Sequence, residues 1–384
     1  MKGLVVCSKG TEDICSLEIN EIIGASSEKR DSCIIFDIKK LEELCILCYK
    51  AQSVEKVILL LDNFEFKGNF EDALSKSISK LKFDKWLDKE TSFRVTCKKI
   101  NNEQLSSEQA AADAGAFVID NIKKKKKYKQ KVELDNPGIT FLLFINKNHA
   151  YFGIDFSGRD LHKREYKLFA HPNSLRSTIA YSVLRIAGFS SKEGLFDPFC
   201  HSGEIPIEAA LFTTNFPVNY FSKEKFAFLK FKTFKTFDFD KFFNAIDKKI
   251  LKPKKSLITC VDFRIMNLNA AKKNAKIAGI NKFINFSRID VEWLDIKLEK
   301  ESIGRIITHP PDLTKHCSIG DIEKLYDKFF YQAEYILKKK GKVVLISKSQ
   351  DALKKAAEKY KFKVEKEAVV CEGKEVLNIL VCGK

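Results

Sequence analysis

The chain has 384 residues, of which 45% are hydrophobic and 11% aromatic, enough apolar material for a large core and a length typical of two or three domains. The formal net charge of +17 favours a polyanionic partner, although a solvated lysine-rich surface would explain it as well. Because the sequence shows neither a signal peptide nor an apolar run of roughly 18 residues, we expect a cytoplasmic protein that does not enter a membrane.

The first 61 residues alternate short apolar runs with amphipathic ones. Strands are expected at 3–7, 32–38 and 56–61, and helices at 14–23 and 41–49. This order predicts a small α+β layer.

The next part of the chain continues in the same style. In chain order we expect a helix at 70–81, a strand at 92–98, a helix at 110–122, and strands at 140–146 and 150–156. No proline occurs before Pro137, so no sharp linker signal divides this region from the first.

A run of lysines follows the expected helix at 110–122. Seven of the nine residues from 123 to 131 are lysine. Cations stabilise a helix C-terminus, but this cluster is denser than capping needs, and contact with RNA phosphates is the functional interpretation. The lysines concerned are Lys123, Lys124, Lys125, Lys126, Lys127 and Lys129.

Charge is distributed unevenly along the chain. Residues 1–150 hold 25 Lys and Arg against 23 Asp and Glu, a difference of +2. The rest therefore holds 43 against 28, a difference of +15. The second part carries the basic excess, which favours a nucleic-acid partner.

The pattern changes after a polar, irregular stretch at 157–172, where helices begin to alternate with short apolar strands. Strands are expected at 194–199, 256–261, 284–289, 305–308 and 341–346, followed by a final pair at 362–367 and 376–382. Strands separated by helices predict an α/β, doubly wound parallel sheet, and the last two strands fit an antiparallel pair at its edge.

The segment Asp197-Pro198-Phe199-Cys200-His201-Ser202-Gly203-Glu204-Ile205-Pro206-Ile207-Glu208-Ala209-Ala210 leaves a strand, turns tightly and enters a helix. Cofactors bind outside the carboxyl ends of strands in such sheets, although an ordinary strand-to-helix turn would read similarly. The absence of G-x-G-x-x-G argues against a nicotinamide dehydrogenase.

At this segment the sequence resembles THUMP-containing class I RNA methyltransferases, above all archaeal tRNA guanine-N2 methyltransferases that modify the acceptor stem. Twelve of fourteen positions match the family pattern D-P-F-C-G-S-G-T-I-P-I-E-A-A, and the segments at 155–166 and 171–180 also resemble family signatures. The resemblance implies a monomer that binds tRNA and uses S-adenosylmethionine. It further implies a ferredoxin-like domain at 1–60, a THUMP domain at 61–155, a linker at 156–173 and a Rossmann-like methyltransferase domain at 174–384.

The resemblance also implies site residues. Those expected near the cofactor are Ser174, Leu175, Arg176, Asp197, Phe199, Cys200, Ser202, Gly203, Asp262 and Asp290, while Lys163 and Arg164 join the RNA-binding set. Asp262 follows a strand, where an acidic side chain can accept hydrogen bonds from ribose hydroxyls or simply cap a helix. The resemblance implies that Asp290 lies near the adenine amine, and capping of the following turn is an equally good interpretation. The single Cys45-x-x-Cys48 pair does not predict a metal site.

His309, Pro310, Pro311 and Asp312 stand where the family has Asn/Asp-Pro-Pro-Tyr/Phe, the motif that offers hydrogen-bond acceptors to the exocyclic amine and stacks the flipped base. A neutral imidazole at His309 can accept a hydrogen bond, whereas Asp312 cannot stack a base. His201 replaces a family glycine, and Glu204 replaces a small hydroxyl residue.

The insertion after the helix that follows Asp197 interleaves phenylalanines with lysines between 225 and 239. These rings either stack on single-stranded RNA or pack over the sheet. For the whole chain, the sequence predicts a tRNA guanine-N2 methyltransferase. The alternatives are a degenerate RNA-binding protein that has lost methyl transfer, and an enzyme acting on ribosomal RNA.

Overall fold

The computed structural model describes residues 1–312 and 318–384. The chain forms two compact units. Unit 1 contains Met1–Cys7, Ser16–Leu161 and Ser222–Ala245, and unit 2 contains Ser8–Cys15, His162–Phe221 and Ile246–Lys384. Within the described ranges, no helix combines the length and apolar character needed to cross a bilayer.

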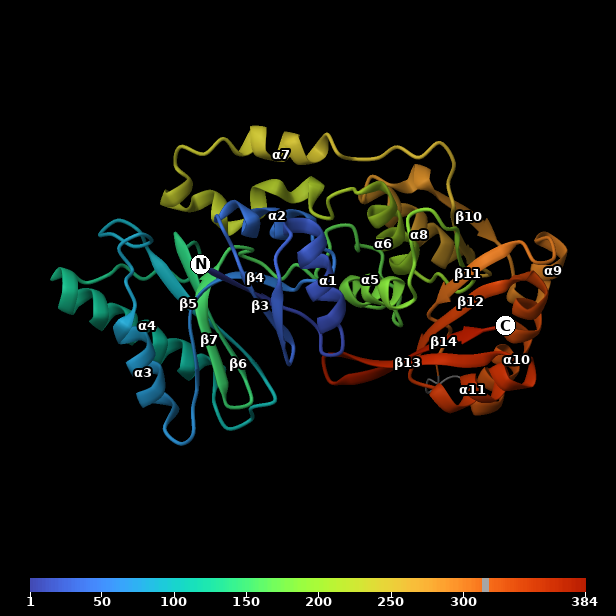
Figure 1. Cartoon of the computed structure of the whole chain (residues 1–384), viewed down its shortest axis with the longest axis horizontal. Helices are drawn as coiled ribbons and strands as arrows, with labels where there is room; N and C mark the ends of the chain where they lie inside the picture. Colours follow the sequence, from blue (N-terminus) through green and yellow to red (C-terminus); the bar gives the residue numbers. More distant parts are fainter. Residues whose placement is uncertain (313–317) are drawn as a thin grey trace. The chain divides into compact units, whose positions relative to one another are not determined.

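Unit 1 is built on one seven-stranded sheet with the order β2-β3-β1-β4-β7-β6-β5 (Figure 1). Its strands are β1 (Lys2–Val6), β2 (Ser27–Arg30), β3 (Cys33–Asp37), β4 (Lys56–Glu65), β5 (Phe93–Ile100), β6 (Ile139–Asn146) and β7 (His149–Asp155). The helices alternating with them are α1 (Glu12–Ile23), α2 (Glu42–Lys50), α3 (Phe70–Lys80) and α4 (Ser107–Lys126).

The ten-residue strand β4 joins the two regions that the sequence analysis treats as separate domains. Its first half pairs with β1, and the strand pairs along most of its length with β7. The expected boundary between residues 60 and 61 therefore falls inside a strand, because both halves of the unit share one sheet.

Unit 2 carries a second seven-stranded sheet, with the order β10-β9-β8-β11-β12-β14-β13. Its strands are β8 (Leu195–Asp197), β9 (Ile258–Asp262), β10 (Ile284–Arg288), β11 (Ile303–Thr308), β12 (Leu337–Ser347), β13 (Lys363–Glu372) and β14 (Glu375–Gly383). Strands β8 to β12 run parallel to one another, and β14 is antiparallel both to β12 and to the edge strand β13. The α/β Rossmann-like fold predicted from the sequence is confirmed.

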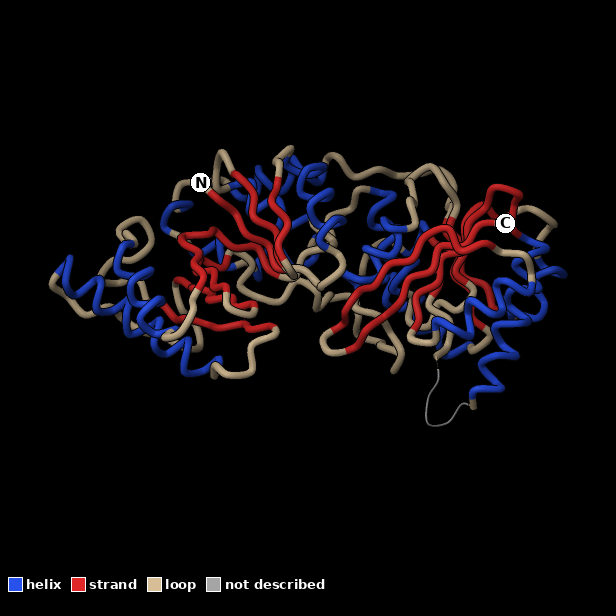
Figure 2. The backbone as a smooth tube through the Cα atoms, turned by 60° about the horizontal axis from the view of Figure 1, so that its bottom comes forward, coloured by secondary structure: helices blue, strands red, loops and turns tan. Residues whose placement is uncertain are grey.

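Helices cover both faces of this sheet (Figure 2). Its main helices are α5 (Ser177–Ile186), α6 (Glu204–Thr214), α8 (Ile265–Ile277), α9 (Leu294–Lys297), α10 (Ile319–Ile336) and α11 (Gln350–Lys359). Successive residues of β11 point to opposite faces: Ile307 packs in the core cluster of α5, α6 and α8, and Ile306 in the cluster of α10 and α11. A strand buried on both faces explains the continuous apolar runs in the sequence.

Most of the aromatic insertion, Ser222–Ala245, belongs to unit 1. It contains the short helical turns η1 (Tyr220–Lys225), η2 (Ala227–Lys230) and η3 (Lys232–Phe234) and the helix α7 (Phe239–Asp247). Phe231 contacts Trp86 and Phe156 edge to face, with ring centroids 5.8 and 5.1 Å apart, and Phe228 is completely buried. These buried phenylalanines therefore pack against other side chains and do not stack on RNA. Their partners belong to unit 1, however, and not to the second sheet.

The segment expected as a linker at 156–173 is largely structured. Phe156 and Leu161 are buried in unit 1, and Tyr166 is buried in the core of unit 2. The Tyr166 hydroxyl donates to Glu208 at 2.7 Å, which fixes the second half of the segment on α6. Buried polar contacts of this kind are absent from a flexible linker.

Candidate functional site at the carboxyl ends of the strands of unit 2

Asp197 is the last residue of β8 and lies beside the end of β11. Its Oδ1 accepts a hydrogen bond from the Thr308 hydroxyl at 2.5 Å and another from the Phe199 amide at 3.2 Å. Burial raises the pKa of Asp197 to about 8, against the lowering effect of these two donors. The carboxyl group is therefore mainly protonated at neutral pH, and it joins the ends of two neighbouring strands.

Asp262 ends the adjacent strand β9 and is held by three donors. Its Oδ1 accepts from the Arg264 amide at 2.9 Å, its Oδ2 accepts from the His201 amide at 3.2 Å, and the Asn267 amide group donates to both oxygens at 3.2 and 3.1 Å. Burial raises its pKa, opposed by these hydrogen bonds. A carboxylate has about four acceptor sites, so groups of this chain already use the capacity of Asp262.

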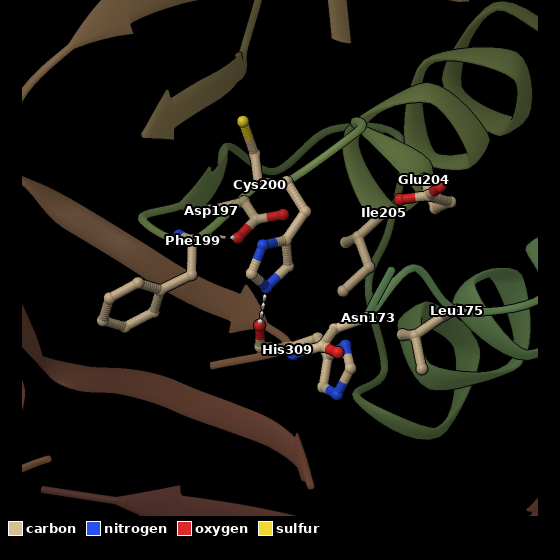
Figure 3. A pocket seen from close by; sticks show the side chains of 9 residues that line it. Asn173, Leu175, Asp197, Phe199, Cys200, Glu204, Ile205 and His309 are labelled. Atoms are coloured by element: carbon tan, nitrogen blue, oxygen red, sulfur yellow. Dashed lines mark hydrogen bonds between the residues drawn. The ribbon is translucent and has the colours of Figure 1, made fainter. Parts of the chain in front are cut away.

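His201 lies in the turn after β8 with its ring directed inward. Its backbone has φ of +47°, in the left-handed region that side chains with a Cβ rarely adopt. The Nε2 atom lies 3.0 Å from the carbonyl oxygen of His309, a hydrogen bond drawn as a dashed line in Figure 3. The ring also stacks on His171, with centroids 4.5 Å apart and planes 19° apart.

The small cavity at this turn is almost filled. Figure 3 shows Asp197, Phe199 and His309 around it. Its volume is about 10 Å³, roughly the space that one water molecule needs. The residues that line it are Asn173, Leu175, Asp197, Phe199, Cys200, His201, Glu204, Ile205 and His309.

Asp312 lies next to His309, where several hydrogen bonds hold its carboxylate in place. It accepts a hydrogen bond from the Ser347 hydroxyl and from the Lys348 and Ser349 amides at 3.2 and 3.4 Å. His309 Nε2 lies 3.3 Å from its other oxygen. Burial opposes ionisation, but these hydrogen bonds outweigh it and lower the pKa of Asp312. The group is a buried anion that organises the loop.

The two prolines between His309 and Asp312 direct the chain away from β11. The carbonyl oxygen of Pro311 accepts a hydrogen bond from the Tyr326 hydroxyl at 2.8 Å, which ties the loop to α10. The loop is thus held at His309, Pro311 and Asp312.

A large cavity of about 290 Å³ lies on the other side of His309. The residues that line it are Pro172, Asn173, Ser174, Leu175, His309, Asp312, Lys348, Glu372, Glu375 and Leu377. Within it, the Glu372 carboxylate accepts hydrogen bonds from the Arg176 amide at 3.1 and 3.3 Å. Ser174 and Leu175, predicted near the cofactor, thus line this cavity, and Arg176 holds one of its carboxylates.

The remaining residues predicted near the cofactor shape the turn. Ser202 donates to Glu204 at 2.7 Å and accepts from the His171 amide at 3.1 Å. Gly203 has φ of +89°, and a Cβ at this position would lie 2.9 Å from Ala271, so glycine is required there. Cys200 is buried in the core beneath. Asp290 lies apart from these residues in the chain and caps the turn η5 (Val291–Trp293) by accepting from the Glu292 amide at 3.2 Å.

The residues predicted to bind RNA fall into two groups. Lys123, Lys124, Lys125, Lys126, Lys127, Lys129 and Lys163 are exposed. Lys125 donates to the carbonyl oxygens of Ser79 and Leu81, and Lys126 pairs with Asp84 at 2.8 Å. Arg164 requires a correction: its side chain is only 1% exposed and pairs with Glu208 at 3.1 Å, so it stabilises the core instead of presenting a charge to RNA.

Several residues at the site were not singled out by sequence reasoning. His171 stacks on His201, Asn267 orients Asp262, and Glu372 lines the large cavity. A charged Glu208 within the apolar face of α6 was a detectable sign of a buried ion pair, because such groups are rarely buried alone. Glu372 lies almost two hundred residues from Arg176, and no local pattern signals that contact. Across 1–312 and 318–384, no group of three His, Cys, Asp or Glu side chains is arranged to hold a metal ion.

A core of parallel strands with an antiparallel edge, helices on both faces and carboxyl groups at the ends of β8 and β9 is the arrangement of a class I methyltransferase fold, whose methyl donor is S-adenosylmethionine. The chain belongs to the family described as the RMKL-like methyltransferase domain, which matches residues 164–377. A second family, described as the THUMP domain, matches residues 69–155.

Full-length relatives support the same family. The chain is 29% identical to a tRNA (guanine(6)-N2)-methyltransferase of Methanocaldococcus jannaschii over 97% of both chains. It is 28% identical to the enzyme of the same name from Archaeoglobus fulgidus, over 99% of this chain and 93% of that protein. The predicted family is thereby confirmed.

Solved structures agree on the fold. A protein described as a methyltransferase and solved in complex with S-adenosylhomocysteine (SAH) superposes with a TM-score of 0.84 at 16% identity, covering 100% of this chain and 98% of that one. A possible methylase from Clostridium difficile 630 gives 0.84 at 23% identity, covering 100% and 97%. TrmN from Thermus thermophilus gives 0.72 at 20% identity, covering 100% and 99%.

Proposed function

We propose that this chain is an S-adenosylmethionine-dependent methyltransferase that modifies N2 of the guanine at position 6 of tRNA. The observation that carries the proposal is the hydrogen bond between Thr308 and Asp197. It brings the loop His309–Asp312, which follows β11, against the turn after β8. Two relatives bearing this activity in their names align with almost the whole chain. We further propose that it acts as a monomer in the cytoplasm.

The small cavity does not admit S-adenosylmethionine in the conformation described here. Its volume is about 10 Å³, roughly the space of a single water, and the buried His201 is among the residues that line it. The carboxyl groups of Asp197 and Asp262 stand at the ends of β8 and β9, where a donor would be held, and the backbone amide of His201 bonds to Asp262. Donor binding thus requires the ring to move.

The large cavity is the proposed site of the flipped guanine. Its volume of about 290 Å³ is just below the range for small-molecule pockets, about 300 to 1,000 Å³. Enzymes that act on a base within a helix extrude it into such a pocket and read its hydrogen-bonding edge. The Glu372 carboxylate can accept from the adjacent N1–H and N2–H groups of guanine, a pair of donors that adenine lacks.

The exposed lysines at the end of α4 are proposed to contact tRNA phosphates. Lys123, Lys124 and Lys127 are exposed, and lysines that displace counterions give affinity that falls with salt. Changing these three to alanine is expected to reduce the slope of log K against log salt by about 2 to 3. Changing Lys338, Lys339 and Lys340, which are also exposed, provides a control of equal charge.

Methyl transfer is tested with unmodified tRNA and S-adenosylmethionine carrying a labelled methyl group. We expect N2-methylguanosine at position 6, located by mass spectrometry of nuclease fragments, and none in a tRNA with adenosine there. Binding of tRNA without any incorporation of label would contradict the proposal.

A second function is favoured by one observation. The buried His201 and Asp197 line a cavity of only about 10 Å³, as expected of an RNA-binding protein that has lost methyl transfer. Such a protein would bind tRNA with the same lysine dependence, and would show no binding of S-adenosylmethionine in wild-type or His201-substituted form.

A further inference from the structure

His201 lines the small cavity and is tied to the ends of three different strands. The ring bonds to the His309 carbonyl after β11, the backbone amide of His201 bonds to Asp262 at the end of β9, and His201 itself follows β8. All of these groups belong to unit 2. His201 is therefore integrated into the carboxyl-terminal edge of the sheet and is not a surface side chain that folded inward.

Two other histidine rings contact the ring of His201. His171 lies against one face of the His201 ring at 4.5 Å, and His309 approaches edge-on at 5.8 Å between centroids. Only 6% of His201 is exposed. Burial lowers its pKa to about 3, so the ring is neutral at neutral pH.

The protonation of the ring follows from its hydrogen bond. A carbonyl oxygen can only accept, so Nε2 carries the hydrogen and Nδ1 carries a lone pair. That Nδ1 is buried without a hydrogen-bond partner. The ring is thus fixed by one hydrogen bond and by stacking, while a buried polar atom without a partner favours departure from the cavity.

We infer that His201 is a plug for the methyl-donor pocket, and that this chain binds S-adenosylmethionine only when the imidazole has left the small cavity. The inference rests on the proposed function, since it concerns the donor of that reaction. A closed majority conformer raises the apparent Kd by the inverse of the open fraction. Removing the ring should therefore tighten donor binding without adding any contact to the donor.

The test measures binding by titration calorimetry with S-adenosylmethionine and SAH. We expect His201→Gly to bind both at least about tenfold more tightly than the wild type, equivalent to about 1.4 kcal/mol. His201→Ala should also bind more tightly, because it removes the ring and keeps a Cβ.

A matched control separates the ring from the backbone. Lys361, just after α11, is exposed and has φ of +61°, so Lys361→Gly relieves a comparable left-handed residue of unit 2 away from the cavity. We expect its Kd values to equal those of the wild type. Circular dichroism and thermal unfolding verify that all three variants fold.

Each outcome bears on the inference. Equal Kd values for the wild type and His201→Gly would overturn it, as would tightening by glycine but not by alanine, or no donor binding by any form. Tight donor binding by His201→Gly together with unmethylated tRNA would instead refute the proposed function and leave the plug intact.

Discussion

The small and the large cavity share Asn173, Leu175 and His309, yet one holds about 10 Å³ and the other about 290 Å³. The residue that follows β11 lines both, but the end of β8 contributes only to the small cavity, and the residues at the ends of β12, β13 and β14 contribute only to the large one. In the small cavity, the side chain of His201, whose backbone is left-handed, bonds to the carbonyl oxygen of His309. In the large cavity, backbone amides donate hydrogen bonds to the carboxylates of Asp312 and Glu372 and hold them in the cavity walls. The two cavities thus differ in their walls: the buried His201 lines the small one, and carboxylates held by backbone amides line the large one.

The largest effect is expected when the scaffold common to both cavities is weakened. Glu208→Ala leaves the buried Arg164 guanidinium without its carboxylate and should reduce the free energy of unfolding by about 3 to 5 kcal/mol. Glu193→Ala breaks a more exposed ion pair with Arg305 and should cost less than about 1 kcal/mol. Chemical denaturation measures both, and similar losses in the two variants would show that the buried pair has no special role.

The protonated Asp197 makes the closed side sensitive to pH. Its folded pKa of about 8 lies above the ordinary value of 3.8, so the folded state binds the extra proton. Stability is therefore greatest below about pH 4 for this group, and it falls as pH rises to about 8, by at most about 1.4 kcal/mol per pH unit. Asp197→Asn keeps an acceptor and removes the titration. We expect the wild type to lose stability relative to this variant between pH 5 and 8, and parallel pH profiles would contradict the assignment.

The open side should depend on Asp312. Asp312→Ala leaves the Ser347 hydroxyl and the Lys348 amide without their acceptor, while the Ser349 amide keeps its bond to the Ser347 hydroxyl oxygen, and we expect a cost of about 2 to 3 kcal/mol. Asp312→Asn retains one oxygen and should cost less. If both variants unfold at the denaturant concentration of the wild type, the carboxylate does not organise the wall.

The smallest effect is expected from the stacking partner of the plug. His171→Ala removes a ring contact of the kind that contributes about 0.5 to 1.5 kcal/mol, and should shift His201 partly out of the cavity. Donor binding should then tighten several-fold, less than for His201→Gly. His149→Ala, in β7 of unit 1, is a control histidine, and equal Kd values for the two variants would argue against the stack as a restraint.

The sequence predicted the second sheet well, because its strands are buried on both faces and stand out as apolar runs. It did not predict β2, whose residues Ser27–Arg30 are mostly exposed and polar. It placed a domain boundary inside β4, since strand pairing between β1, β4 and β7 leaves no local mark.

At the site, the sequence identified the turn after β8 and the loop after β11, and it marked His201 as an unusual residue. The position of the ring depends on a left-handed backbone and on a carbonyl 108 residues away, which no local pattern contains. Arg164 was misassigned for a similar reason, because its partner lies 44 residues further along the chain.

Whether His201 closes the donor pocket is decided by a crystal structure of the wild-type chain grown with excess SAH. We expect the His201 ring and SAH to exclude each other: either the ring bonds to the His309 carbonyl and the pocket is empty, or SAH lies beside Asp197 and the ring has turned away. SAH bound there with the ring still on the His309 carbonyl would contradict it.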